Sequence, residues 1–277
     1  FGTAQRGHGG PRTFRGRDLQ VNLPLTLEEI AEGVTKKIRV TRYVRCEVCG
    51  GTGAEPGTKP EKCPTCKGHG EVRQVTRSFL GQMVQVTTCP ACHGRGEVIP
   101  RPCGACAGEG RVKDTVTVEI PVPAGVESGN YITLDGEGHA GPFNGPPGDL
   151  IVVFEEKRHK LFERHGVDIL YNLTLSIPQA VLGAKLQVPT LNGKVEVDIP
   201  PGVQSGKVLR LRGKGIRHLD SSRRGDELVR IAVWIPDKLT PRERELFEEL
   251  SRSEGIRPPE DDEGGFFHKM KSVLFGE

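Results

Sequence analysis

The sequence predicts a mostly β protein with two tandem, similar β-sandwich-like domains. A cysteine-rich module of β-hairpins is expected inside the first domain, and a helical segment at the C-terminus. The 277 residues include 37 glycines and 21 prolines but only 5% aromatic residues, which is typical of strands joined by many turns. Segments outside the cysteine region recur along the chain, and all eight cysteines lie in four similar blocks.

Residues 1–16 form a glycine- and arginine-rich run without periodicity, which we interpret as the remnant of a flexible linker and as a sign that the chain is a fragment. The formal charge of +3 comes from 39 basic and 36 acidic residues that are mixed along the chain. This balance argues against nucleic acid as the main ligand. No apolar run reaches the roughly 18 residues of a membrane span, and no secretory signal is present, so we expect a cytoplasmic protein with no membrane partner.

Three segments of the first half recur in the second. The segment VNLPLTLEEIAEGVTKKIRV from Val21 resembles YNLTLSIPQAVLGAKLQV from Tyr171. The segment IPVPAGVESG from Ile120 resembles VDIPPGVQSG from Val197, and GDLIVVF from Gly148 resembles GDELVRI from Gly225. The offset falls from about 150 to about 77 positions, so the first copy holds about 70 additional residues. We therefore expect β domain I at 17–40 plus 115–165, an inserted module at 41–114, and β domain II at 166–239.

Alternating apolar residues in VTVEIPV and KVEVDI predict half-buried strands. Each copy also predicts one short helix with a capping box. The helices start at Thr26 with Glu29 and at Ser176 with Gln179, and they stop at Gly33 and Gly183.

Residues 240–277 predict C-terminal helices. The first begins at Thr240, Pro241 and Glu243, presents Leu246, Phe247 and Leu250, and is expected to end at Gly255. After the linker IRPPEDDEGG, a second helix has an apolar face made of Phe266, Phe267, Met270, Val273 and Leu274. This face packs either on the protein's own body or against a second chain.

The cysteine blocks are CEVCGGTG from Cys46, CPTCKGHG, CPACHGRG and CGACAGEG. A CxxC turn supplies two thiolates, and zinc takes four in a tetrahedron, so eight cysteines predict two Zn²⁺ per chain. Four thiolates leave no open coordination position, which favours a structural role. Disulfides, an iron–sulfur cluster and a redox pair fit this spacing and setting less well.

The segment EVRQVTRSFLGQMVQVTT, between the second and third blocks, predicts a hairpin with its turn at residues 80–82. A hairpin brings its ends together, so one zinc is expected at Cys63, Cys66, Cys89 and Cys92. The outer blocks then provide Cys46, Cys49, Cys103 and Cys106 for the other zinc. Pairing of the blocks in sequential order is the alternative.

Four CxxCxGxG blocks inserted into the first of two similar β domains, followed by FFHKMKSVLF, resemble the class A DnaJ co-chaperones, the J-domain heat-shock proteins, without their amino-terminal J domain. The resemblance implies a co-chaperone, not an enzyme, that binds non-native polypeptides, prevents their aggregation and delivers them to a DnaK-type ATP-dependent chaperone. It also implies a homodimer formed through the terminal helix.

By position, the resemblance places the client-binding groove of domain I at Leu19, Ile38, Val40, Val118 and Val152. A client segment would add there as a strand. Alternating apolar residues of this kind equally fit an ordinary core. The competing function is a zinc-dependent thiol–disulfide oxidoreductase, which requires a metal-free CxxC pair.

Overall fold

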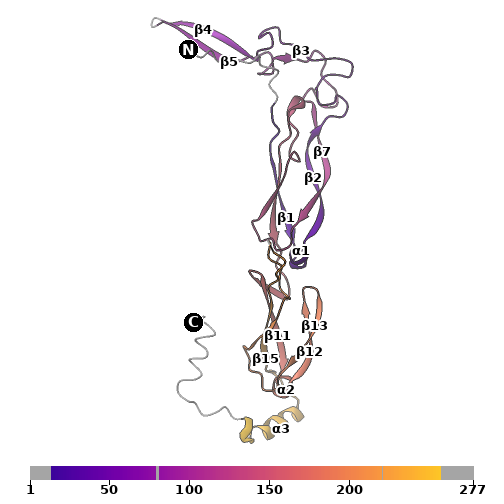
Figure 1. Ribbon diagram of the computed structural model, residues 1–277, viewed down its shortest axis with the longest axis vertical. Helices are drawn as coiled ribbons and strands as arrows, with labels where there is room; N and C mark the ends of the chain where they lie inside the picture. The colour runs from indigo at the N-terminus through magenta and orange to yellow at the C-terminus, as the bar shows by residue number, and fades with distance from the viewer. Residues whose placement is uncertain (1–13, 79–80, 220, 257–277) are drawn as a thin grey trace.

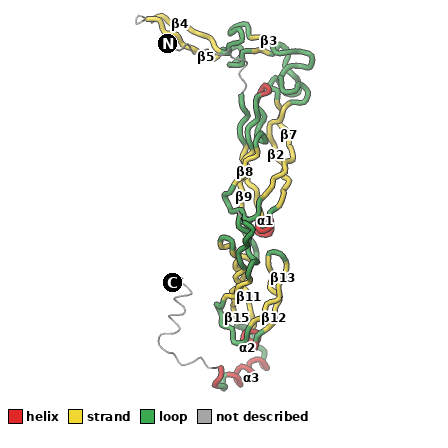
Figure 2. Tube along the Cα trace, viewed as in Figure 1, coloured by secondary structure: helices red, strands yellow, loops and turns green. Residues whose placement is uncertain are grey.

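The computed structural model describes residues 14–78, 81–219 and 221–256. As predicted, the chain is mostly β. Two β domains lie end to end along the long axis, and the inserted module sits at the far end of the first, with the β4–β5 hairpin projecting sideways (Figure 1). Figure 2 shows that helices occupy only short stretches between strands and at the end of domain II.

Domain I has two layers. A three-stranded sheet in the order β1-β9-β8 comprises β1 (Leu19–Leu25), β9 (Leu150–Glu156) and β8 (Tyr131–Leu134), with β1 parallel to β9. The second layer is a long antiparallel ribbon of β2 (Val34–Arg45) and β7 (Arg111–Val122). The helix α1 (Leu27–Glu32) connects the layers, and a 3-10 turn, η1 (Pro142–Asn144), lies near the module.

Domain II repeats this plan. Its sheet has the order β10-β11-β15-β14, with β10 (Phe162–His165), β11 (Asp168–Ser176), β15 (Glu227–Trp234) and β14 (Val208–Leu211). The strand β11 is parallel to β15, as β1 is to β9. The helix α2 (Ile177–Leu182) leads to a ribbon of β12 (Ala184–Thr190) and β13 (Gly193–Ile199). The duplication seen in the sequence is therefore a duplication of structure.

The structure differs from the expected domain boundaries at three places. Residues 162–165 form β10, which pairs with β11 and so belongs to the sheet of domain II. Residues 41–45 and 111–114 continue the strands β2 and β7, which stay paired from Val34–Val122 to Arg45–Arg111. The module proper is therefore shorter than the sequence suggested, because the β2–β7 ribbon stays regularly paired beyond Val40 and Val116.

Both short helices have the predicted capping boxes, and Gly33 and Gly183 are their C-caps. The third helix, α3 (Pro241–Leu250), also starts at the predicted cap but ends at Leu250, followed by Ser251 and a separate 3-10 turn, η2 (Glu254–Ile256). The predicted end at Gly255 is thus wrong. Leu246, Phe247 and Leu250 are 42%, 37% and 48% exposed, so no packing among the described residues supports a longer helix. The predicted apolar face at 266–274 lies outside the described residues.

The inserted module contains the small pair β3 (Glu61–Lys62) with β6 (Glu97–Val98) and the hairpin of β4 (Glu71–Ser78) with β5 (Gly81–Thr88). The turn expected at 80–82 is misplaced, because Gly81 pairs with Ser78 and Gln82 with Arg77 as part of the ladder. Among the described residues, no helix is long and apolar enough to cross a membrane.

The hydrophobic core of domain I continues into domain II. Leu25, Ile120 and Leu150 are fully buried in it, and residues from the second half of the chain belong to the same cluster: Phe162, Ile169, Leu191 and Ile216. A separate cluster fills the remainder of domain II around Leu175, Val188 and Ile231. Burying a large aliphatic side chain stabilises a fold by about 1.5–3 kcal/mol, so the shared cluster couples the domains strongly.

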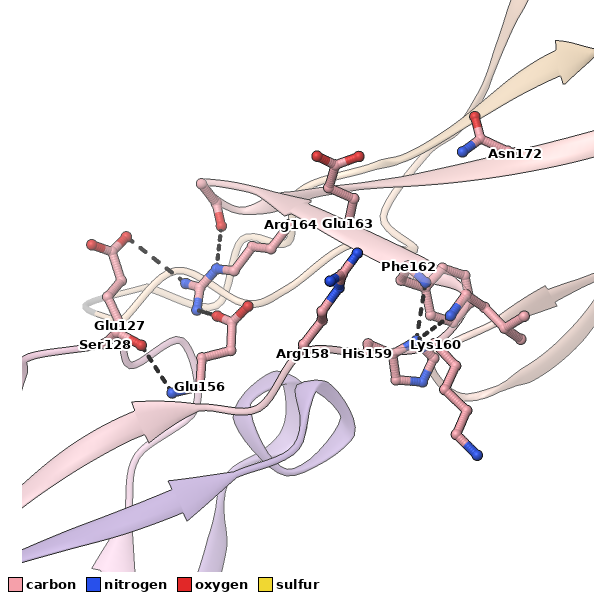
Figure 3. Close-up of a pocket in the computed structure, with 12 residues that line it drawn as sticks. Glu127, Ser128, Glu156, Arg158, His159, Lys160, Phe162, Glu163, Arg164 and Asn172 are labelled. Atoms are coloured by element: carbon pink, nitrogen blue, oxygen red, sulfur yellow. Dashed lines mark hydrogen bonds and ion pairs between the residues drawn. The ribbon is translucent and has the colours of Figure 1, made fainter.

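A polar cleft of about 930 Å³ lies beside this junction (Figure 3). Arg164 on β10 reaches into domain I, where it donates to the carbonyl oxygen of Val126 at 2.9 Å and to the carboxylate of Glu156 at 2.8 Å. On α1, Glu32 accepts from Arg224 at 2.7 Å and from Asn192 at 2.6 Å, both in domain II. Polar contacts thus reinforce the shared core.

Candidate metal centres

The eight thiols gather in two groups of four. Cys46, Cys49, Cys103 and Cys106 form one, and Cys63, Cys66, Cys89 and Cys92 form the other; within each group all sulfur atoms lie within 4.8 Å of one another. This is the nested grouping, in which the outer blocks meet each other and the inner blocks meet across the β4–β5 hairpin. The sequential alternative does not describe this structure.

The distances between sulfur atoms match those between the ligands of a tetrahedral metal ion and are too long for a disulfide bond. Between blocks, Cys46 and Cys103 are 4.0 Å apart, and Cys66 and Cys92 are 3.6 Å apart. A disulfide requires about 2.05 Å. Four sulfurs at about 2.3 Å from a zinc ion lie about 3.8 Å from one another in a tetrahedron. The donor set therefore fits two zinc ions, as the sequence predicted.

Glycines build both centres in the same way. In each block, the amide of the last glycine donates to the second cysteine sulfur, as from Gly53 to Cys49 at 3.3 Å and from Gly70 to Cys66 at 3.2 Å. A Cβ on Gly53 would lie only 2.3 Å from the carbonyl oxygen of Gly108 in the opposite block. Its φ of 77° also favours glycine.

The two blocks of each centre support each other symmetrically. In the first centre the amide of Cys46 donates to Gly110 at 3.0 Å, and that of Cys103 donates to Gly53 at 2.8 Å. The second centre has the corresponding pair of hydrogen bonds, from Cys63 to Gly96 and from Cys89 to Gly70. Each centre thus consists of two CxxC turns joined by a reciprocal pair of backbone hydrogen bonds.

The pKa values of the thiols also indicate that a cation is needed to hold four thiolates together. A backbone amide hydrogen bond lowers the pKa of Cys63 to about 6. Burial alone would raise the pKa of Cys49, but amide hydrogen bonds outweigh it and lower the pKa to about 7. Burial raises the pKa of Cys92 and of Cys106 to about 11, and the neighbouring thiols add to the effect. Four thiolates can coexist in such a space only around a positive ion.

The module is positioned by contacts that the sequence analysis did not anticipate. Phe143 in η1 donates its amide to Glu109 at 3.0 Å, and the guanidinium of Arg95 lies 3.4 Å from the centroid of the Phe143 ring. Phe143 has φ = 53°, which is uncommon for a bulky residue. The only sequence signal is the surrounding PFNGPP turn, which does not reveal its partner.

The predicted groove residues divide into two sets. Val40, Val118 and Val152 are 4%, 8% and 0% exposed and belong to the core of domain I. Leu19 and Ile38 are partly buried and pack against that core. The sequence analysis did not single out other partly buried side chains that pack on the same core, such as Val116, Ile132 and Leu134.

Fold and site together define a duplicated β protein that carries two four-cysteine metal centres between the strands of its first domain. The family described as DnaJ C terminal domain matches residues 19–236. The chain is 46% identical to the Chaperone protein DnaJ of Prosthecochloris aestuarii over 99% of this chain and 74% of that protein. It is 47% identical to that of Chlorobium limicola, over 97% of this chain and 70% of that protein.

A third relative, the Chaperone protein DnaJ of Chlorobaculum tepidum, is 49% identical over 94% of this chain and 65% of its own length. The chain therefore belongs to the DnaJ family of chaperone proteins, and the co-chaperone function predicted from the sequence is confirmed. Because these relatives are chaperone proteins, the oxidoreductase alternative is not favoured.

Proposed function

We propose that this co-chaperone holds non-native polypeptides in a groove of domain I and passes them to a DnaK-type chaperone. The observation that carries the proposal is a pair of strand edges in that domain that have no partner among the described strands. In the described sheets β1 pairs only with β9, and β2 pairs only with β7, so each has an edge without a partner strand. An extended client segment can hydrogen-bond to such an edge without any demand on its sequence.

Apolar side chains would give the groove its affinity. Leu19 on β1 and Ile38 on β2 are partly buried and would contact the client segment, while Val40, Val118 and Val152 are buried beneath them in the core. A client side chain that covers Leu19 and Ile38 gains roughly 25 cal/mol for each Å² of apolar surface removed from water.

The two zinc ions would be structural. Closed sets of four thiolates would hold the module rigid, with Cys46, Cys49, Cys103 and Cys106 around one ion and the hairpin cysteines around the other. Within this proposal the second zinc centre, the one at the β4–β5 hairpin, assists the transfer of client to the DnaK-type partner, and no residue acts as a catalyst.

The terminal segment with Phe266, Phe267, Met270, Val273 and Leu274 would form a homodimer. A dimer carries two weak client grooves on one particle, which raises the overall affinity for long unfolded chains. We further propose that the protein acts in the cytoplasm, with neither nucleic acid nor membrane as its main partner.

The test is suppression of aggregation of a chemically unfolded model protein, with zinc measured on the same sample. We expect suppression with about two zinc ions per chain, and weaker suppression by Ile38→Asn. The matched control is Thr35→Asn, an exposed position on the same strand. Two zinc ions without suppression, or equal suppression by both variants, would contradict the proposed groove.

A further inference from the structure

The three-stranded sheet of domain I has a second free edge. Its strand order is β1-β9-β8, so β8 forms the edge opposite β1, and no described strand pairs with its outer side. Backbone groups along such an edge are left unpaired by the sheet and can bond to another extended chain. The proposed client groove uses the edges of β1 and β2, so the edge of β8 lies outside it.

A bulge at Gly129 sets the register of this edge. The amide of Gly129 donates to the carbonyl oxygen of Phe154 at 3.0 Å, and the amide of Phe154 donates to the carbonyl oxygen of Asn130 at 2.8 Å. Gly129 has φ = 91°. These features define a β-bulge whose first residue is a left-handed glycine. The bulge thus directs the carbonyl group of Asn130 towards β9.

The register determines which backbone groups of β8 point away from the sheet. Hydrogen bonding alternates along an antiparallel ladder, so Ile132 bonds to Val152 as Asn130 bonds to β9. The intervening Tyr131 and Thr133 direct their N–H and C=O groups to the free edge. Two donors and two acceptors therefore lie in one line, as a partner strand requires.

Domain II has charged side chains at the equivalent edge. Its β14 follows the same bulge, because the amide of Gly206 donates to Ile231 and that of Ile231 donates to Lys207, each at 2.8 Å. Lys207 precedes β14 and Arg210 lies within it, and charged side chains on edge strands hinder pairing with other chains. The strand β8, with the sequence YITL, carries no charge. The edge of domain I therefore lacks the protection that its repeat has.

An apolar cavity of about 380 Å³ lies at the start of β8. Its lining includes the buried Val126 and Phe154 and the exposed Tyr131 and Leu219, and none of its lining residues is charged. Tyr131 and Leu219 are 67% and 48% exposed. A Cβ built on Gly129 would meet no atom within 4 Å, so there is room for a side chain beside the bulge.

Domain II provides one side of this cavity. Leu219 lies in the loop between β14 and β15, and this loop meets domain I backbone to backbone. A Cβ on Gly125 would lie 2.3 Å from the carbonyl oxygen of Arg217 and 2.7 Å from the amide nitrogen of Leu219. The amide of His218 donates to the carbonyl oxygen of Arg223 at 3.0 Å, which closes the loop on itself. The cavity is thus formed jointly by the two domains.

We infer that the edge of β8 and this cavity form a further polypeptide-binding site, which takes an extended, uncharged segment with a large apolar side chain. The segment pairs with Tyr131 and Thr133, and its apolar side chain enters the cavity beside Gly129. The free backbone groups favour a polypeptide strand, and the uncharged lining favours an apolar side chain over a charged one. The site goes beyond the proposed groove, and neither site needs the other in order to bind.

The test counts how many peptides one chain binds. The probe is an acetylated eight-residue peptide of alternating leucine and glutamine, followed by isothermal titration. Thr133→Pro removes an outward amide and leaves the hydrogen bonds that Ile132 makes to β9 in place. We expect this variant to bind one peptide fewer than the parent chain, because its affinity at this edge falls by about tenfold or more.

The outcome is independent of the proposed groove. If the groove also binds the peptide, the parent chain takes two and the variant one; if it does not, the counts are one and none. The matched control, Val208→Pro, removes an outward amide from β14 and should keep the count of the parent chain. Equal counts in the parent chain and Thr133→Pro, or the same loss in Val208→Pro, would overturn the inference.

A second variant tests the cavity without any change in β8. Leu219→Lys places a charge at the cavity and should weaken binding at this site about fivefold, with Leu161→Lys as the control. Leu161 is 55% exposed and lines the polar cleft on β10, so it is a leucine of similar exposure outside the site. Unchanged affinity in Leu219→Lys contradicts the role of the cavity. A change in oligomeric state of Thr133→Pro, with an unchanged peptide count, would assign the edge to a second copy of the chain instead.

Discussion

Glu227 occupies a position where the duplicated domain has a leucine. The repeat GDLIVVF places Leu150 in the core of domain I, and the corresponding GDELVRI places Glu227 in domain II. Glu227 is 0% exposed, and neither carboxylate oxygen has a hydrogen-bond partner in the described part of the chain. We predict that Glu227→Leu stabilises the protein, and that the gain depends on pH.

The magnitude follows from the titration of this carboxyl. Burial raises the pKa of Glu227 from 4.5 to about 7, against a smaller opposing effect of Lys214. The folded state thus binds a proton that the unfolded state releases between these two pH values. The contribution of this carboxyl to the stability of the parent chain is therefore largest below pH 4.5, falls as the pH rises towards 7, and levels off above it. The full loss amounts to about 3 kcal/mol.

The assay is denaturant unfolding of the parent chain and of Glu227→Leu at several pH values from 5.5 to 8.5. Subtraction of the two curves removes the pH dependence of all other groups, including the thiols. We expect the advantage of the variant to grow with pH up to about 7 and then stay constant. Glu196→Leu, at an exposed position of β13, is the control and should show little of this change. An advantage that is the same at pH 5.5 and 8.5 would refute the reasoning.

Three further predictions concern the metal, the oligomer and the domain junction. Cys46→Ser/Cys103→Ser should lower the zinc content from two ions per chain to one, because the centre at the β4–β5 hairpin keeps all four of its ligands. Metal analysis that finds two ions or none would contradict two separate centres. Removal of the residues after Gly264 should give monomers in sedimentation, whereas a persistent dimer would refute the role of the terminal segment. Arg164→Ala should weaken the contact between the two domains by about 1–3 kcal/mol, because it leaves Glu156 unpaired and the carbonyl of Val126 without its donor. The variant should then be cleaved faster by a protease within residues 157–161, between the domains. An unchanged rate of cleavage would argue against a stabilising role of Arg164.

Local patterns in the sequence predicted those parts of the fold that depend on neighbouring residues. The capping box at Thr26 and Glu29 acts within four residues, and the grouping of the cysteines follows from one hairpin. Contacts between distant segments left no such signal. Neither the stacking of Arg95 on Phe143 nor the shared core around Phe162 could be inferred, because each depends on how separate elements meet.

The burial of an acidic side chain at Glu227 could not be predicted from the sequence either. In the burial pattern of β15, Glu227 faces inward together with Val229 and Ile231, but alternation assigns apolar character to such positions and gives no reason to expect an acid there. The end of α3 was missed because Gly255 is a strong stop signal, although residues 251–254 before it are exposed and make no packing contacts with the part of the chain that the structure describes.

The ribbon of domain II closes with the two residues 191–192 between the paired Thr190 and Gly193. In domain I the equivalent ribbon stays paired up to Arg45 and Arg111, and the whole metal-binding module leaves from that point. The module therefore occupies the place of a hairpin turn. The entropic cost of a longer loop rises only with the logarithm of its length. The tip of such a ribbon can therefore carry an inserted unit while the host strands keep their register, and domain II shows the same ribbon closed by a short turn.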